Sequence, residues 1–140
     1  MNWEEFKEQS NKKKCLDMWN WLAVNPGEFK RDFFVQFGLP AKILTNDASD
    51  YYCYACKDVL ERSDVDPNHI SCANCPVDWR NATTRLKTLD IRYHCNCKGN
   101  LFYDWRMEHD RLRLTKHTET DHTQAAAENI VIAIETTWKE

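Results

Sequence analysis

Four cysteines arranged as two matched pairs are the residues of this chain whose spacing most clearly predicts a chemistry. Each pair has a two-residue gap, and fifteen residues separate the pairs, which are Cys53 with Cys56 and Cys72 with Cys75. A two-residue gap lets both thiolates of one tight turn point at the same ion, and two such turns complete a tetrahedral shell. The spacing therefore predicts one structural Zn²⁺ held by four cysteines. The alternative is a pair of redox dithiols or two disulfides.

A closer pair, Cys95 and Cys97, follows this zinc module, with His94 immediately before it. Such a pair could bind a second zinc together with histidines, or it could replace part of the first shell. The other reading is that both are small, partly buried apolar residues. Cys15 lies on the apolar face of an expected helix, and we expect it in the core because free cysteine is among the most buried residue types.

No catalytic residues are predicted. A closed shell of four cysteines leaves no open position for a catalytic water. The sequence has no glycine-rich phosphate loop and no nucleophile elbow. Its one His-x-Glu, His117-Thr118-Glu119, follows both cysteine pairs, whereas zinc deaminases place theirs before the cysteines. A zinc-dependent nuclease or deaminase is therefore the least favoured class of function.

Composition limits the compartment and the partner. The net charge of −3 argues mildly against a general nucleic-acid binder, which usually carries a basic excess. The seven cysteines are an odd number and cannot all form disulfides within one chain. No apolar signal segment opens the sequence, and the apolar stretch 130–134 is too short to span a bilayer. We expect a cytoplasmic protein with reduced thiols and no membrane contact.

The elements that must position these residues are expected to be mainly helical. Apolar residues at helical spacing predict helices within 1–25, over 28–36, over 101–114 and from Asp121 to the end of the chain. Asp121 and Gln124 are spaced as the capping box of the last helix.

Two further elements are expected in the middle of the chain. Pro76 predicts a short helix that runs to Trp79. Period-two alternation followed by a turn at 98–100 predicts a β-hairpin over 89–101. The fold class is then α+β, mainly helical, a small single domain over 1–140 stapled by a four-cysteine zinc knuckle with a short β-hairpin. Its expected parts are N-terminal helices 1–38, the zinc module 51–79, the hairpin 89–101 and C-terminal helices 101–140.

The helix over 101–114 is the expected partner-binding face. It carries Tyr103, Arg106 and Arg113, and aromatic residues and arginine are the usual anchors of protein interfaces. Acidic residues are interspersed along the same helix, so the alternative is a solvated helix face with no partner.

Several short motifs together resemble a known group of proteins. The order runs from Trp19-Asn20-Trp21-Leu22 through Asn25-Pro26 to the two knuckles, with Cys72-Ala-Asn-Cys75-Pro76 as the second, and then to Tyr103-Asp104-Trp105. This order resembles that of small cysteine-rich zinc-knuckle proteins of tailed bacteriophages. The resemblance covers most of the chain and implies a phage origin and a zinc knuckle, without an activity that could be transferred. In those proteins the close cysteines are often adjacent, whereas Asn96 separates them here.

These observations favour a zinc-stabilised, non-enzymatic interaction protein. Its expected partner is a host protein, from a defence system, a nuclease or the transcription machinery, which it would modulate or inhibit. The mild acidity suits a basic surface on such a target. The alternative is a nucleic-acid-binding zinc module, since zinc knuckles bind single strands through aromatic and basic side chains.

Overall fold

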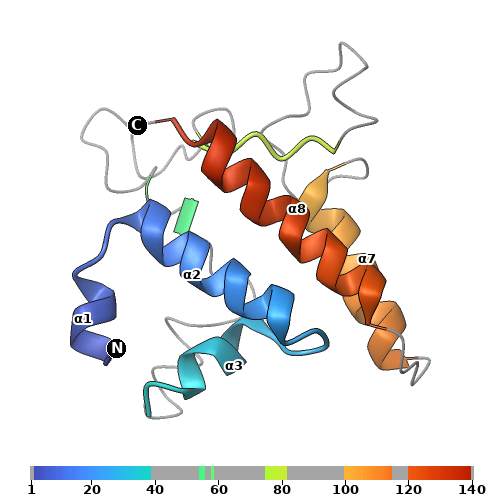
Figure 1. The fold of residues 1–140 in the computed structure, drawn as a ribbon, viewed down its shortest axis with the longest axis horizontal. Coiled ribbons are helices and arrows are strands. Elements are labelled where there is room, and N and C mark those ends of the chain that lie inside the picture. Colours follow the sequence, from blue (N-terminus) through green and yellow to red (C-terminus); the bar gives the residue numbers. More distant parts are fainter. Residues whose placement is uncertain are drawn as a thin grey trace, which may run out of the picture.

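The computed structural model describes residues 2–38, 54–55, 58, 75–81, 100–114 and 120–139. The helices with defined bounds are α1 (Trp3–Lys7), α2 (Asn11–Val24), α3 (Lys30–Val35), α7 (Leu101–Leu114) and α8 (Asp121–Thr137). Helix α8 packs against both α2 and α7 and runs antiparallel to each of them, while α3 packs on α2 (Figure 1).

The predicted α+β fold class is wrong for the described part of the chain, which contains helices and no strand. Its one β-type pairing is an isolated antiparallel bridge between Arg80 and Asn100. Asn100, which the hairpin prediction placed in a turn, pairs with Arg80 in the segment that follows Cys75. The Leu101 N–H donates to the Trp79 carbonyl at 2.7 Å, and α7 begins at Leu101 because its apolar residues recur at helical spacing. Residues 89–99 lie outside the described residues.

Side-chain caps divide the N-terminal region into two helices. The Asn2 side chain accepts from the Glu5 N–H at 2.9 Å and begins α1. The Ser10 hydroxyl accepts from the Lys13 N–H at 3.2 Å and begins α2. Both caps satisfy backbone donors that have no partner inside the helix. Helix α3 begins where the Asp32 carboxylate accepts from the Phe29 N–H at 2.7 Å, and its exit turn contains Gly38 with φ +67°.

The predicted capping box of the last helix is wrong. Asp121 is the first helical residue rather than the cap, and the cap is Thr120, which makes no side-chain hydrogen bond to the helix. The Gln124 side chain donates instead to Glu128 at 3.0 Å. The apolar residues at helical spacing that predicted this helix share its buried face: Ala127, Ile130, Val131 and Ile134 are buried, and Trp138, the fifth of them, is partly buried against the core.

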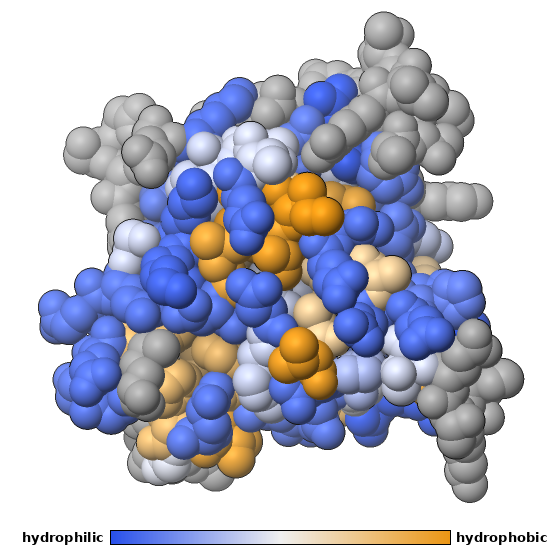
Figure 2. Space-filling view, in the orientation of Figure 1, coloured by the Kyte–Doolittle hydropathy of each residue, from blue (hydrophilic) through white to orange (hydrophobic). Residues whose placement is uncertain are grey.

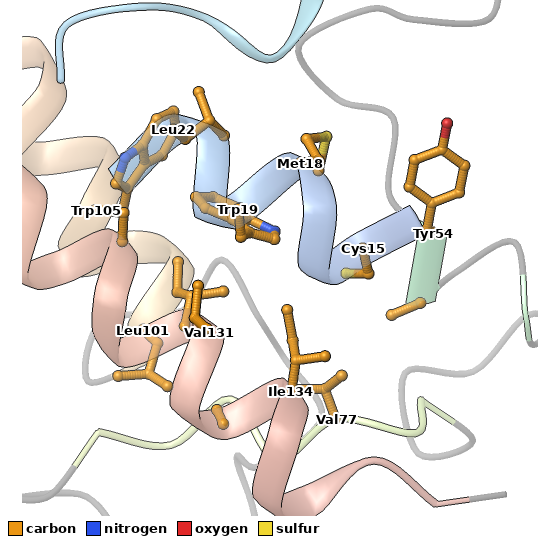
Figure 3. Close-up of a cluster of buried hydrophobic side chains, with 14 of the residues drawn as sticks. Cys15, Met18, Trp19, Leu22, Tyr54, Val77, Leu101, Trp105, Val131 and Ile134 are labelled. Carbon is orange, nitrogen blue, oxygen red and sulfur yellow. The ribbon is translucent and has the colours of Figure 1, made fainter. Parts of the chain in front are cut away.

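One hydrophobic core joins these elements (Figure 3). Trp19 of α2 lies at its centre and meets Trp105 of α7 edge-on, with ring centroids 5.0 Å apart. A second aromatic group surrounds Phe6, whose ring lies 5.5 Å from Phe33 and 5.9 Å from Tyr54. Such edge-to-face pairs stabilise by about 0.5–1.5 kcal/mol beyond the area they bury. Cys15 is 1% exposed, which confirms its predicted place in the core.

Segment 75–81 lies against the start of α7 and the end of α8. The predicted short helix from Pro76 to Trp79 is absent from it. Its backbone is held from outside: the Asp78 N–H donates to the Thr137 hydroxyl at 2.9 Å, and the Pro76 carbonyl accepts from the Lys139 N–H at 3.0 Å. These bonds replace the internal ones that a helix would have made.

Candidate functional site

The described residues include one of the four predicted zinc ligands, Cys75. The other three lie outside the described residues, as do Cys95 and Cys97, and they are Cys53, Cys56 and Cys72. Within the described residues no group of three or more side chains could hold a metal ion. The zinc shell therefore stays a prediction, and the structure tests only whether the surroundings of Cys75 suit one.

The surroundings of Cys75 fit a thiolate ligand. Its side chain is buried, and its sulfur accepts a hydrogen bond from the Trp79 indole N–H at 3.2 Å. Outer-shell hydrogen bonds of this kind orient metal ligands and tune them. Tyr54 and Ala55, which separate the cysteines of the first pair, are buried in the same core as Cys75. The two residues between the cysteines of the first pair and the last cysteine of the second pair therefore lie in one core.

Arg113 stabilises the fold of the turn between α2 and α3. Its guanidinium lies 4.2 Å from the centroid of the Phe29 ring and donates to the Gly27 carbonyl at 3.2 Å. Of the other two predicted anchors, Tyr103 is partly buried, and Arg106 lines a pocket. The structure therefore gives different surroundings to the three residues that the sequence grouped.

A pocket of about 360 Å³ lies between the start of α3 and one face of α7. Three aromatic rings and four polar side chains line it: Phe29, Lys30, Phe102, Trp105, Arg106, His109 and Asp110. The five lining residues of α7 recur at intervals of three or four, so they share one face of the helix.

Lys30 is the most unusual residue of this pocket, because it is only 3% exposed. Its ammonium nitrogen lies 4.5 Å from the centroid of the Phe102 ring and 5.4 Å from that of Trp19. Both distances fall within the range in which an aromatic face attracts a cation. The indole N–H of Trp105 is also buried in this region, with no acceptor among the described residues.

His109 is packed between two rings, 4.8 Å from Phe29 and 4.8 Å from Trp105. Its Nε2 donates to the Glu28 carbonyl at 3.0 Å, since a carbonyl oxygen can only accept.

The pKa of the Glu28 carboxyl is raised, first by a hydrogen bond with Asp32, then by burial and by repulsion from the Asp32 carboxylate, while Arg113 lowers it. The site combines basic and donor groups with aromatic walls, which suits binding of an acidic group.

Comparison with known proteins adds no assignment to this site. No family model, curated protein or solved structure matches the chain significantly. Among the described helices, even α8 with its 17 residues falls short of the length and apolarity needed to cross a membrane.

Proposed function

We propose that this chain acts by binding a protein partner, and that the pocket between α3 and α7 receives an acidic side chain of that partner. A Zn²⁺ ion stabilises the fold, held by Cys53, Cys56, Cys72 and Cys75. The resemblance to phage zinc-knuckle proteins supports a host protein as the partner, which the chain would modulate or inhibit.

One observation carries this proposal: two basic side chains, Lys30 and Arg106, meet at a single aromatic pocket. The single carboxylate of the lining belongs to Asp110, whose side chain is 54% exposed and therefore well screened by water. Lys30 is almost completely buried, so its charge is screened much less. An acidic side chain that enters the pocket loses part of its hydration. Charge-assisted hydrogen bonds to the basic side chains offset that loss.

The aromatic walls support a protein interface over a catalytic cleft. Tryptophan and arginine are the residue types that most often carry the binding energy of an interface, and both line this pocket. Among the described residues, no serine, threonine or cysteine lines this pocket, so the side chains that most often serve as nucleophiles are missing from its lining.

Capture from infected host cells, with the tagged full-length chain as bait, tests the proposal. Three baits are compared: wild type, Arg106→Gln in the pocket, and Lys12→Gln on α2 as a control with the same loss of charge. Zinc content and helicity are measured for each bait. The partner is expected to be a protein whose recovery falls at least about tenfold with Arg106→Gln, the equivalent of about 1.4 kcal/mol, and is unchanged with Lys12→Gln.

Two results would overturn the proposal. One is that every captured protein is recovered equally by the two variant baits. The other is capture of nucleic acid alone, with binding that falls steeply as salt is added, because phosphate contacts release counterions. That second result would establish the nucleic-acid-binding alternative instead.

A further inference from the structure

A second pocket lies between α2 and the end of α3, and the proposed function does not use it. Its volume is about 260 Å³, and it is lined by Asp17, Asn20, Trp21, Phe33, Gln36 and Phe37. Asp17 and Trp21 are four residues apart on α2, and Phe33 and Phe37 are four apart along α3 and its exit. Each segment thus presents a pair of side chains on one face. Figure 2 shows apolar side chains at the surface beside α1 and α3, with hydrophilic side chains around them.

Three aromatic rings form the apolar walls of this pocket. The Trp21 ring lies 6.0 Å from Phe33 at an interplanar angle of 64°, and the Phe37 ring lies 5.6 Å from Phe33 at 86°. Phe33 is 4% exposed, while Trp21 and Phe37 are only partly buried. The rings therefore meet at steep angles and form a corner. A cation in such a corner lies within attractive range of more than one ring face.

The polar wall of the pocket is a carboxylate. The Asp17 side chain is 17% exposed, and its Oδ1 lies 2.7 Å from the Lys13 ammonium. Its Oδ2 is shielded from solvent and has no hydrogen-bond partner within the described residues. Lys13 is 57% exposed, and ion pairs with such an exposed partner are weak. The negative charge of Asp17 therefore attracts an ammonium group in the pocket by Coulomb interaction. This attraction does not require contact between the ammonium group and Oδ2.

We infer that this pocket binds the ammonium group of a lysine side chain presented by a partner protein. The occupant follows from charge and shape. Lysine carries a compact ammonium group on a flexible four-carbon stem, which can pass between aromatic walls. The net charge of −3 also attracts basic surfaces. The inference does not rest on the proposed function, because the two pockets share no lining residue and can fail separately.

Two short peptides test the inference against the zinc-containing, full-length protein. The probes are acetyl-Gly-Lys-Gly-amide and its norleucine counterpart, which keeps the four-carbon stem and removes the charge. The readout is the indole N–H signal of Trp21 in a ¹⁵N-labelled sample, assigned as the one signal of six that disappears in Trp21→Phe. The lysine peptide is expected to bind at least about threefold more tightly than the norleucine peptide.

Two substitutions at the carboxylate should act in opposite directions. Asp17→Asn should weaken binding of the lysine peptide at least about threefold, because it removes the attracting charge. Lys13→Ala should strengthen it, because it removes the ammonium group that now lies 2.7 Å from Asp17. Glu135→Gln on α8 makes the same charge change as Asp17→Asn at an exposed site and should leave binding unchanged.

A variant that unfolds would bind the lysine peptide more weakly. Unfolding therefore cannot explain tighter binding by Lys13→Ala together with weaker binding by Asp17→Asn. Equal binding of the two peptides would overturn the inference, since the pocket would then select only for an apolar stem. Absence of a Trp21 shift with either peptide would also overturn it, as would weaker binding in both variants.

Discussion

At the scale of single residues, Gly27 fixes how the turn between α2 and α3 meets α7. Its φ is +93°, a value that residues with a Cβ rarely adopt, and a Cβ there would lie 3.4 Å from the Leu112 side chain. Its carbonyl also accepts the hydrogen bond from Arg113. The backbone at Gly27 thus orients Phe29 and Lys30, which line the pocket between α3 and α7.

Gly27→Ala is expected to lower the free energy of unfolding by about 2 kcal/mol, because alanine is strained at this φ and its Cβ would come as close as 3.4 Å to the end of the Leu112 side chain, at the tight limit of ordinary contact. Gly38→Ala is the matched control. The φ of Gly38 is +67°, at the edge of the left-handed region, and a Cβ there would meet nothing within 4 Å. Its cost should be only about 1 kcal/mol. Denaturant midpoints at unchanged m-value measure both, and equal costs would contradict the packing argument at Gly27.

Residue types alone could not predict which side chains of α7 face the pocket. The sequence grouped Arg106 and Arg113 as partner-binding residues, but only Arg106 of the two lines this pocket. Arg113 is 86 residues from Gly27 in the chain, so a local sequence pattern cannot predict their hydrogen bond. Lys30 and His109 were missed for the same reason. The available signal was their spacing from aromatic residues, since Lys30 directly follows Phe29 and His109 lies four residues after Trp105.

At the scale of elements, segment 75–81 connects the second cysteine pair to the helices. Its Asp78 forms a two-bond ion pair with Arg80, with distances of 3.0 and 2.8 Å. The Asp78 N–H is satisfied by the Thr137 hydroxyl at the end of α8. The position of Cys75 therefore depends on the last turn of α8.

Thr137→Val tests this connection. Valine keeps the shape of threonine but leaves the buried Asp78 N–H without its acceptor, which should cost about 1–3 kcal/mol. Thr136→Val is the control, because the Thr136 hydroxyl donates to the Ile132 carbonyl of its own helix, at an exposed site. Its effect should stay within about 0.5 kcal/mol. Thermal unfolding of both variants measures the two losses of stability. If Thr136→Val destabilises the protein as much as Thr137→Val, the role given to Thr137 is wrong.

Helices with long apolar stripes were predictable, and elements that depend on distant partners were not. The bounds of α7 match the predicted 101–114, and the buried stripe of α8 is the predicted one. The cap of α8 was placed one residue late because Asp121 is a better capping type than Thr120. The sequence placed Asn100 in a local turn, because a local pattern does not reveal a distant neighbour, and here the neighbour is Arg80.

At the scale of the whole molecule, Tyr54 and Ala55 of the first cysteine pair's spacer and Cys75 of the second pair lie in the same hydrophobic core as the helices. Trp19, Trp105 and Ile134 pack together from three different helices (Figure 3). Tyr54 reaches the same core and lies 5.9 Å from Phe6, and the Asn11 side chain donates to Asp58 at 3.4 Å. Loss of zinc should therefore destabilise the protein without abolishing its helices.

Removal of the predicted zinc is the decisive experiment at this scale. Freshly purified protein is expected to contain about one zinc per chain, and a chelator should lower the Tm by more than about 10 °C while most of the helical circular dichroism remains. A shift of 10 °C corresponds to about 2.5 kcal/mol, because each kcal/mol changes the Tm of a chain this long by roughly 4 °C, and zinc ligation in small zinc peptides contributes on the order of 10 kcal/mol. Cysteine substitutions test which residues bind the zinc. Cys72→Ser should lower both zinc content and Tm, while Cys95→Ser should affect them less.

If Cys95→Ser removes zinc as completely as Cys72→Ser, the ligands are assigned wrongly. A content below about half a zinc per chain in the wild type would refute the site itself.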